Sequence, residues 1–128
     1  MIKILLIEDD LDDVELLEDT LQSNNVAYIV NVKNDGNAAI EYIKTCVDCP
    51  DIIILDFNLP KVHGREVIKE IKSLPSFRDI PLLILTTSSA KEDMDYAYKH
   101  GADKYLIKPT SLQQIKEMCG VIVDLAKK

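Results

Sequence analysis

The sequence has no apolar stretch long enough to cross a membrane and no export signal. A membrane-spanning helix needs roughly 18 or more consecutive apolar residues, and no run here approaches that length. The apolar start, Met1–Ile7, passes directly into three acidic residues, so it is too short for a signal-peptide core and lacks a cleavage pattern. We therefore expect a protein of the cytoplasm that does not bind a membrane.

Basic residues are also scarce relative to acidic ones. The chain has 15 lysines and arginines against 22 aspartates and glutamates, for a net charge of −7. Binding to nucleic acid requires a basic surface, so this balance argues against a nucleic-acid partner. An acidic protein instead attracts metal cations or basic surfaces of partner proteins.

Cysteines are few and odd in number, which argues against a disulfide framework. The chain has three, in a sequence without an export signal. Cys46 and Cys49 form a C-x-x-C motif, but it falls at the end of a helical pattern, whereas a redox pair uses a helix N-terminus. A zinc site needs two more ligands, and the other candidates lack companion spacing: Cys119, His63 and His100. Two unreactive residues at a helix end are the favoured interpretation, and a redox or metal role is the alternative.

Five short apolar runs are present instead of one long one. Three are continuously apolar, which is typical of parallel strands buried on both faces. The run at 27–32 is less uniform and suits an edge strand. The runs are IKILLI (2–7), AYIVNV (27–32), DIIILD (51–56), PLLILT (81–86) and KYLIK (104–108).

Between these runs, apolar residues recur at helical spacing. The positions are Val14, Leu17 and Leu21, then Ala39, Ile40 and Ile43, then Val67, Ile68 and Ile71, and finally Leu112, Ile115, Cys119 and Ile122. A more polar helix is expected over 90–100. Five strand–helix alternations predict an α/β fold, a doubly wound five-stranded parallel sheet, in the common strand order 2-1-3-4-5. With 128 residues and no linker, one domain is expected.

Carboxylates follow the first and third strands, at the point where this strand order reverses. Glu8 and Asp9 end the run at 2–7, and Asp56 ends the run at 51–56. Two such charges about 4 Å apart repel by about 4 kcal/mol at an effective dielectric constant of about 20. Either their pKa values rise or a cation is present, and oxygen ligands suit Mg²⁺. A plain helix start explains the acids at 10, 12 and 13.

Two further polar side chains follow the remaining strands. Thr86 ends the run at 81–86, and Lys108 ends the run at 104–108. Taken singly, they are an ordinary strand threonine and a surface lysine. Because the carboxyl ends of parallel strands share one edge of the sheet, we expect an ammonium and a hydroxyl beside the three acids.

These residues together resemble the response-regulator receiver domains. The matching motifs are IEDD (7–10), ILDFNLPKVHG (54–64), LTTSS (85–89) and YLIKP (105–109), and their spacings also fit. The resemblance implies the flavodoxin-like (βα)5 fold, two-component signal transduction, and a receiver domain over residues 1–128 without an output domain. The TTS triplet and the SLPSFRDIP connection are most similar to chemotaxis-type, single-domain regulators, including those paired with phytochrome-like histidine kinases.

The resemblance assigns a role to each of these side chains. Asp56 corresponds to the phosphoacceptor, which takes a phosphoryl group from the phosphohistidine of a sensor histidine kinase or phosphotransfer protein. Mg²⁺ would be held by Glu8, Asp9, Asp56 and the backbone carbonyl of Asn58. Lys108 would pair with the phosphoryl group, and its bond to the following proline is expected to be cis.

The resemblance also implies a switch and a set of residues that tune hydrolysis. The Thr86 hydroxyl would bond the new phosphoryl group, and Tyr105 would rotate toward the core and alter the face made by the fourth helix, fifth strand and fifth helix. The alternative for Tyr105 is an exposed strand aromatic without a switching role. Asn58, Thr87 and Ser88 occupy the positions that tune hydrolysis, and Asp56 would be phosphorylated and slowly dephosphorylated by the chain's own catalysis.

Partner surfaces are less well defined by the sequence. Leu16 lies off the apolar stripe of its helix and is either a kinase contact or a stray surface leucine. Met118, Ile122 and Leu125 extend the apolar zone of the last helix, as a homodimer or effector surface or as deeper packing. The downstream protein is not specified by any motif.

Two other functions are compatible with parts of this pattern. A phosphatase of the haloacid-dehalogenase type also places a nucleophilic aspartate after a strand, but it needs a second acid where Asn58 stands. A pseudo-receiver would use the same fold only for docking, and the intact set of acidic, hydroxyl and lysine residues argues against it.

Overall fold

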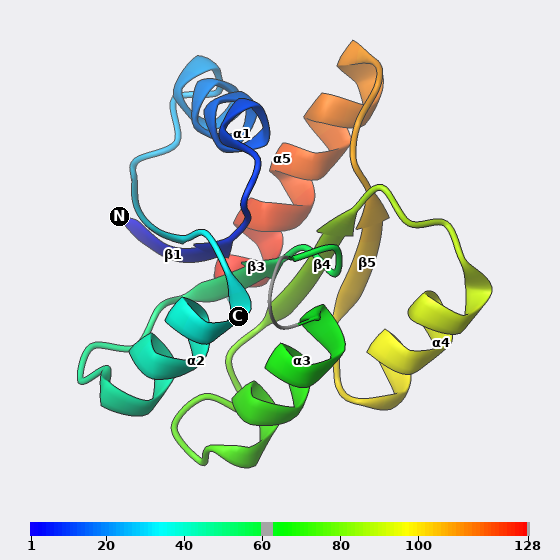
Figure 1. Ribbon diagram of the computed structural model, residues 1–128. Helices are drawn as coiled ribbons and strands as arrows, with labels where there is room; N and C mark the ends of the chain where they lie inside the picture. Colours follow the sequence, from blue (N-terminus) through cyan, green and yellow to red (C-terminus); the bar gives the residue numbers. More distant parts are fainter. Residues whose placement is uncertain (60–62, 128) are drawn as a thin grey trace.

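A single five-stranded parallel sheet with helices on both faces organises the protein (Figure 1). This computed structural model describes residues 1–59 and 63–127. In those ranges the strands are β1 (Ile2–Ile7), β2 (Tyr28–Lys33), β3 (Ile52–Leu55), β4 (Leu82–Thr86) and β5 (Lys104–Ile107), in the order β2-β1-β3-β4-β5. The helices are α1 (Leu11–Ser23), α2 (Gly36–Thr45), α3 (Gly64–Ser73), α4 (Lys91–Lys99) and α5 (Leu112–Ala126). The predicted fold class and strand order are confirmed.

The sheet separates two apolar clusters. Helices α1 and α5 cover one face and α2, α3 and α4 cover the other (Figure 1). Alternate residues of β3 enter the two clusters, with Ile52 and Ile54 on the α1–α5 side and Ile53 and Leu55 on the opposite side. All four are at most 1% exposed. This two-sided burial is the reason that the run is continuously apolar rather than alternating.

Strand β2 lies at one edge of the sheet, as its less uniform sequence predicted. None of its residues is fully buried, and Ile29 is 56% exposed. The opposite edge is β5. The three strands between them therefore carry most of the buried apolar surface.

The helices that follow β1, β2 and β5 each begin with a side-chain N-cap. Asp10 is the N-cap of α1, and its side chain accepts a hydrogen bond from the backbone N–H of Asp12 at 2.9 Å. Asp35 and Ser111 cap α2 and α5 in the same way. These caps start helices directly beyond the sheet, so that loop residues at this edge are held at defined positions.

Packing resolves the alternatives left open for the last helix and shows where two of the cysteines lie. Met118, Ile122 and Leu125 are buried against the sheet, so deeper packing is confirmed for them. Cys46 is the C-cap residue of α2, and both it and Cys49 donate to backbone carbonyls, of Asp48 and Ser76 respectively. Cys46 therefore lies at the helix end as predicted, and Cys49 lies in the loop that follows. Among the described residues, no helix is long and apolar enough to cross a membrane.

Two glycines give opposite stability predictions. An added Cβ at Gly64 would lie 2.6 Å from the Phe57 Cα atom and 3.0 Å from the Asp56 carbonyl oxygen, whereas a Cβ at Gly120 meets nothing within 4 Å. We expect Gly64→Ala to lower the free energy of unfolding by about 1–3 kcal/mol through overpacking. The matched control Gly120→Ala, within α5, should raise it by about 0.5–1 kcal/mol. Chemical denaturation measures both, and equal effects of the two would contradict the tight approach at Gly64.

Candidate functional site

The register of β1 against β3 brings three carboxylates together at the carboxyl edge of the sheet. Ile7 pairs with Leu55, so the next residues, Glu8 and Asp56, lie side by side, and the Asp56 N–H donates to the Ile7 carbonyl at 3.1 Å. Oxygen atoms of Glu8, Asp9 and Asp56 all lie within 4.8 Å of one another. The predicted convergence of these acids is confirmed.

Burial distinguishes the members of this cluster. Glu8 and Asp56 are each 4% exposed, whereas Asp9 faces solvent. Burial raises the pKa of Glu8 to about 7. Burial also acts to raise the pKa of Asp56, but the Asn58 backbone N–H at 3.0 Å and the Lys108 ammonium outweigh it, so this pKa is lowered. Of the two buried carboxyls, Asp56 is therefore the one that stays ionised more readily.

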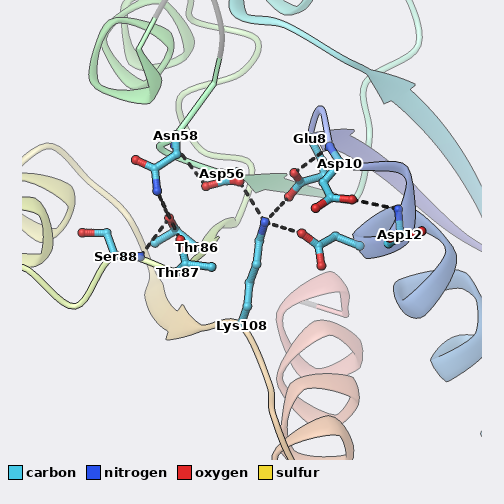
Figure 2. Close-up of polar contacts among 10 residues, drawn as sticks. Glu8, Asp10, Asp12, Asp56, Asn58, Thr86, Thr87, Ser88 and Lys108 are labelled. Carbon is cyan, nitrogen blue, oxygen red and sulfur yellow. Dashed lines mark hydrogen bonds and ion pairs between the residues drawn. The ribbon is translucent and has the colours of Figure 1, made fainter.

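Lys108 follows β5 and points its ammonium at the acids (Figure 2). Its Nζ lies 2.9 Å from Glu8 Oε2, 2.9 Å from Asp56 Oδ2 and 2.6 Å from Asp13 Oδ2. An ammonium has three N–H donors, so these contacts can use all of them. Burial acts to lower the pKa of Lys108, and its three carboxylate partners raise it instead. The location predicted for Lys108 is confirmed, whereas the contact with Asp13 was missed.

The bond that follows Lys108 differs from the prediction. No cis peptide bond occurs among the described residues, and these include Lys108 and Pro109, so the expected cis bond is wrong. The trans isomer is the lower in energy for a bond before proline, by about 0.5–1 kcal/mol.

Thr86 lies beside Asp56 at the end of β4, fully buried. Its hydroxyl is among the groups that lower the pKa of Asp56. Thr86 Oγ1 also accepts from the Ser88 backbone N–H at 3.3 Å and from the Asn58 amide at 3.5 Å. The same amide donates to Thr87 Oγ1 at 3.3 Å (Figure 2). The positions predicted to tune hydrolysis thus gather around Thr86 and Asp56.

Tyr105 is buried, not exposed, so the alternative of an exposed strand aromatic is wrong. It is 6% exposed, and its hydroxyl donates to the Ser88 carbonyl at 2.8 Å. Its ring packs edge-on against Phe57, with 6.1 Å between ring centroids. The inward position means that Tyr105 touches the β4–α4 loop directly.

A polar link that the sequence did not indicate anchors the same loop. The Ser88 hydroxyl donates to Asp93 at 2.6 Å, and Arg65 at the start of α3 pairs with Asp93 at 2.8 Å. The Ser88 hydroxyl, followed by Arg65, lowers the pKa of Asp93. Ser88 therefore bonds Thr86, Tyr105 and α4 at once. No periodicity or motif marks Arg65 and Asp93, because their contact depends on how α3 and α4 lie against each other.

The donor set of the cluster fits a divalent cation. Three carboxylates converge within 4.8 Å, two of them buried, and they carry more negative charge than one ammonium offsets. Hard oxygen ligands in this number suit Mg²⁺, which keeps several of its own waters. The site can therefore combine a cation with an ionised, buried nucleophile.

Comparison with known proteins identifies the class. Residues 4–119 match the family described as "Response regulator receiver domain". Response regulator Rcp1 from Synechocystis sp. (strain PCC 6803) is 34% identical over 120 residues, which cover 90% of this chain and 82% of Rcp1. The chain therefore belongs to the response-regulator receiver domains, the phosphoacceptor signalling proteins of two-component systems.

Solved structures show the same similarity. The Mn²⁺-bound form of Rcp1 has a TM-score of 0.85 and 33% identity, covering 94% of this chain and 91% of that one. The phosphorylated cyanobacterial phytochrome response regulator RcpA has a TM-score of 0.88 and 33% identity, covering 99% and 94%. The receiver domain of sensor histidine kinase PA1611 from Pseudomonas aeruginosa PAO1, with magnesium in its active-site cleft, has a TM-score of 0.82 and 25% identity, covering 99% and 98%.

These relatives settle two of the interpretations that the sequence left open, namely the phosphatase and the phytochrome-associated subgroup. Family membership excludes the haloacid-dehalogenase-type phosphatase. The predicted similarity to phytochrome-associated regulators is confirmed by Rcp1 and RcpA. Receiver domains act with histidine kinases and downstream effectors, and relatives contain Mn²⁺ or Mg²⁺.

The raised pKa of Glu8 predicts a pH-dependent stability in the absence of divalent cations. Between its ordinary value of 4.5 and about 7, the folded chain retains a proton that the unfolded chain has released. The free energy of unfolding should therefore fall as pH rises through this window. The pKa of Asp56 is lowered from its ordinary value of 3.8, so its own effect on stability falls below pH 3.8 and does not overlap the window of Glu8. Denaturation at several pH values measures it.

The matched control for this prediction is Glu8→Gln, which cannot titrate. This variant should lose most of the decline in stability between pH 4.5 and about 7. An equally steep decline in the variant would show that another group is responsible.

Proposed function

We propose that Asp56 accepts a phosphoryl group from the phosphohistidine of a sensor histidine kinase or phosphotransfer protein. The observation that carries this proposal is the position of Asp56, a 4% exposed carboxylate 2.9 Å from the Lys108 ammonium and grouped with two further acids. A lowered pKa keeps this carboxylate ionised. A buried, ionised aspartate is suited to nucleophilic attack.

The proposed transfer exchanges one bond to phosphorus for another. An Asp56 carboxylate oxygen attacks phosphorus, an acyl phosphate bond forms, and the phosphorus–nitrogen bond to the donor imidazole breaks. The imidazole leaves and takes up a proton. Lys108 offsets negative charge on the phosphoryl oxygens, and the Thr86 hydroxyl donates a hydrogen bond to one of these oxygens. In this proposal the chain catalyses its own phosphorylation and its slow dephosphorylation.

Mg²⁺ is the proposed cofactor. Glu8, Asp9, Asp56 and the backbone carbonyl of Asn58 would hold it, and when bound it offsets charge on the transferring phosphoryl group. Support comes from the grouping of these acids within 4.8 Å and from relatives that contain Mg²⁺ or Mn²⁺.

The proposed output passes through Ser88. A bond from Thr86 to the phosphoryl group would shift the β4–α4 loop, whose Ser88 carbonyl holds the Tyr105 hydroxyl at 2.8 Å. Repositioning of Tyr105 would change the face formed by α4, β5 and α5, which a downstream protein would bind. Asn58 and Thr87, whose side chains bond each other at 3.3 Å, are proposed to restrict water at Asp56 and slow hydrolysis.

Phosphorylation by a small-molecule donor tests the proposed function. We expect the intact mass to increase by one phosphoryl group after incubation with acetyl phosphate and Mg²⁺. Asp56→Asn should remain unmodified, and a chelator should abolish the reaction of the wild type. Phosphorylation of the Asp56→Asn variant, or none in the wild type, would refute the assignment and would favour a pseudo-receiver.

Metal affinity tests the proposed ligands separately. Asp9→Asn should weaken Mg²⁺ binding by at least about ten-fold, because an oxygen ligand to the cation is lost. Asp10→Asn is the matched control, since it removes one neighbouring charge while asparagine still serves as the N-cap of α1. Calorimetry or a Mn²⁺ paramagnetic titration gives both constants, and equal losses would show that charge alone matters.

A further inference from the structure

Asp13 makes the shortest contact of the Lys108 ammonium, yet it is not part of the acid cluster. Its Oδ2 lies 2.6 Å from Lys108 Nζ, against 2.9 Å for Glu8 and for Asp56. The grouped oxygens within 4.8 Å belong to Glu8, Asp9 and Asp56, as far as the described residues extend. The ammonium thus has two partners inside the cluster and one outside it.

A cation in the cluster competes with Lys108 for the first two partners. Glu8 and Asp56 would turn oxygens toward the cation, and each would then hold the ammonium less strongly. Asp13 is the one of the three carboxylate partners that lies outside the cluster, so a cation bound in the cluster would not compete for it directly. It can keep Lys108 in place when the other two contacts weaken.

Asp13 is also held on a rigid element. It lies in the first turn of α1, and its N–H donates to the carbonyl of the N-cap residue Asp10 at 3.1 Å. The Lys108 side chain is 13% exposed and that of Asp13 is 30% exposed, so their contact is partly shielded from water. Lys108 and Asp13 both line a small cavity of about 10 Å³, whose other lining residues include Leu16, Leu17 and Met118.

We propose that Asp13 is a positioning residue, which holds the Lys108 ammonium beside Asp56 while a divalent cation occupies the acid cluster. This inference rests on the proposed function, in which Lys108 offsets charge on the incoming phosphoryl group. Without Asp13, a cation that weakens the contacts of Lys108 with Glu8 and Asp56 would also let the ammonium move away from the reacting oxygen of Asp56. Misplacement of a catalytic group by about 1 Å can cost about a hundred-fold in rate.

The rate of phosphorylation tests this role through a double-mutant cycle. Asp13→Asn should slow phosphorylation by acetyl phosphate, at saturating Mg²⁺, by about ten-fold or more. Asp12→Asn is the matched control, because Asp12 is an exposed acid in the same first turn, where its own backbone N–H bonds Asp10. It should change the rate by less than about two-fold, as expected for an exposed charge in this turn. Asp13→Glu should restore part of the lost rate.

The cycle is completed in a background that lacks the lysine. In Lys108→Ala, adding Asp13→Asn should leave the residual rate unchanged, because a residue that acts through Lys108 has nothing left to position. A direct readout without phosphorylation is the ¹⁵N signal of the Lys108 ammonium during a Mg²⁺ titration. It should persist in the wild type and in Asp12→Asn, and broaden in Asp13→Asn.

The outcomes separate this inference from the proposed function. A wild-type chain that takes no phosphoryl group refutes the proposed function and this inference with it. Phosphorylation of the wild type and of Asp13→Asn at equal rates overturns the inference alone. So does an equal effect of Asp13→Asn with and without Lys108, or an ammonium signal that is unaffected by the substitution.

Discussion

The attraction between one ammonium and three carboxylates, two of them buried, governs this edge of the sheet. Glu8 and Asp56 are brought together by strand register, and their charges repel unless a cation intervenes. Lys108, which directly follows β5, supplies that positive charge. It also contacts Asp13 and so connects the cluster to α1. Because all three donors of the ammonium meet carboxylates, removal of any partner changes the balance among the rest. The ionisation of Asp56 depends on this balance.

The contact between Ser88 and its neighbours gives the site a physical route to a distant surface. One residue bonds the Thr86 hydroxyl, the Tyr105 hydroxyl and Asp93 of α4, with Arg65 of α3 behind Asp93. These are discrete polar contacts of 2.6 to 3.3 Å, and a set of discrete contacts is suited to a two-state rearrangement. Arg65 and Asp93 link two helices to that loop, so its position depends on how α3 and α4 pack.

The sequence predicted the fold and the site where local patterns decide them, and failed where side chains meet across elements. The continuous run at 52–55 indicated a buried parallel strand, and strand ends indicated Glu8, Asp56 and Lys108. The pair Asp13–Lys108 joins residues 95 positions apart, and no periodicity encodes it. Asp13 looked like an ordinary helix-start acid, since the first turn favours such residues anyway. Similarly, the burial of Tyr105 depends on the Ser88 carbonyl and on Phe57, not on the strand's own pattern.

The sheet divides the apolar core into two clusters, and this division limits which helices can affect one another through side-chain packing. The apolar cluster under α1 and α5 is separated from the one under α4 by a layer of hydrogen-bonded backbone. Buried side chains on one side of this layer belong to a different cluster from those on the other side, so repacking under α4 does not directly repack the cluster under α1 and α5. At the carboxyl rim of the sheet, polar contacts reach helices of both faces, since Lys108 contacts Asp13 of α1 and Ser88 contacts Asp93 of α4. A rearrangement that begins at this rim can therefore act on both faces at once.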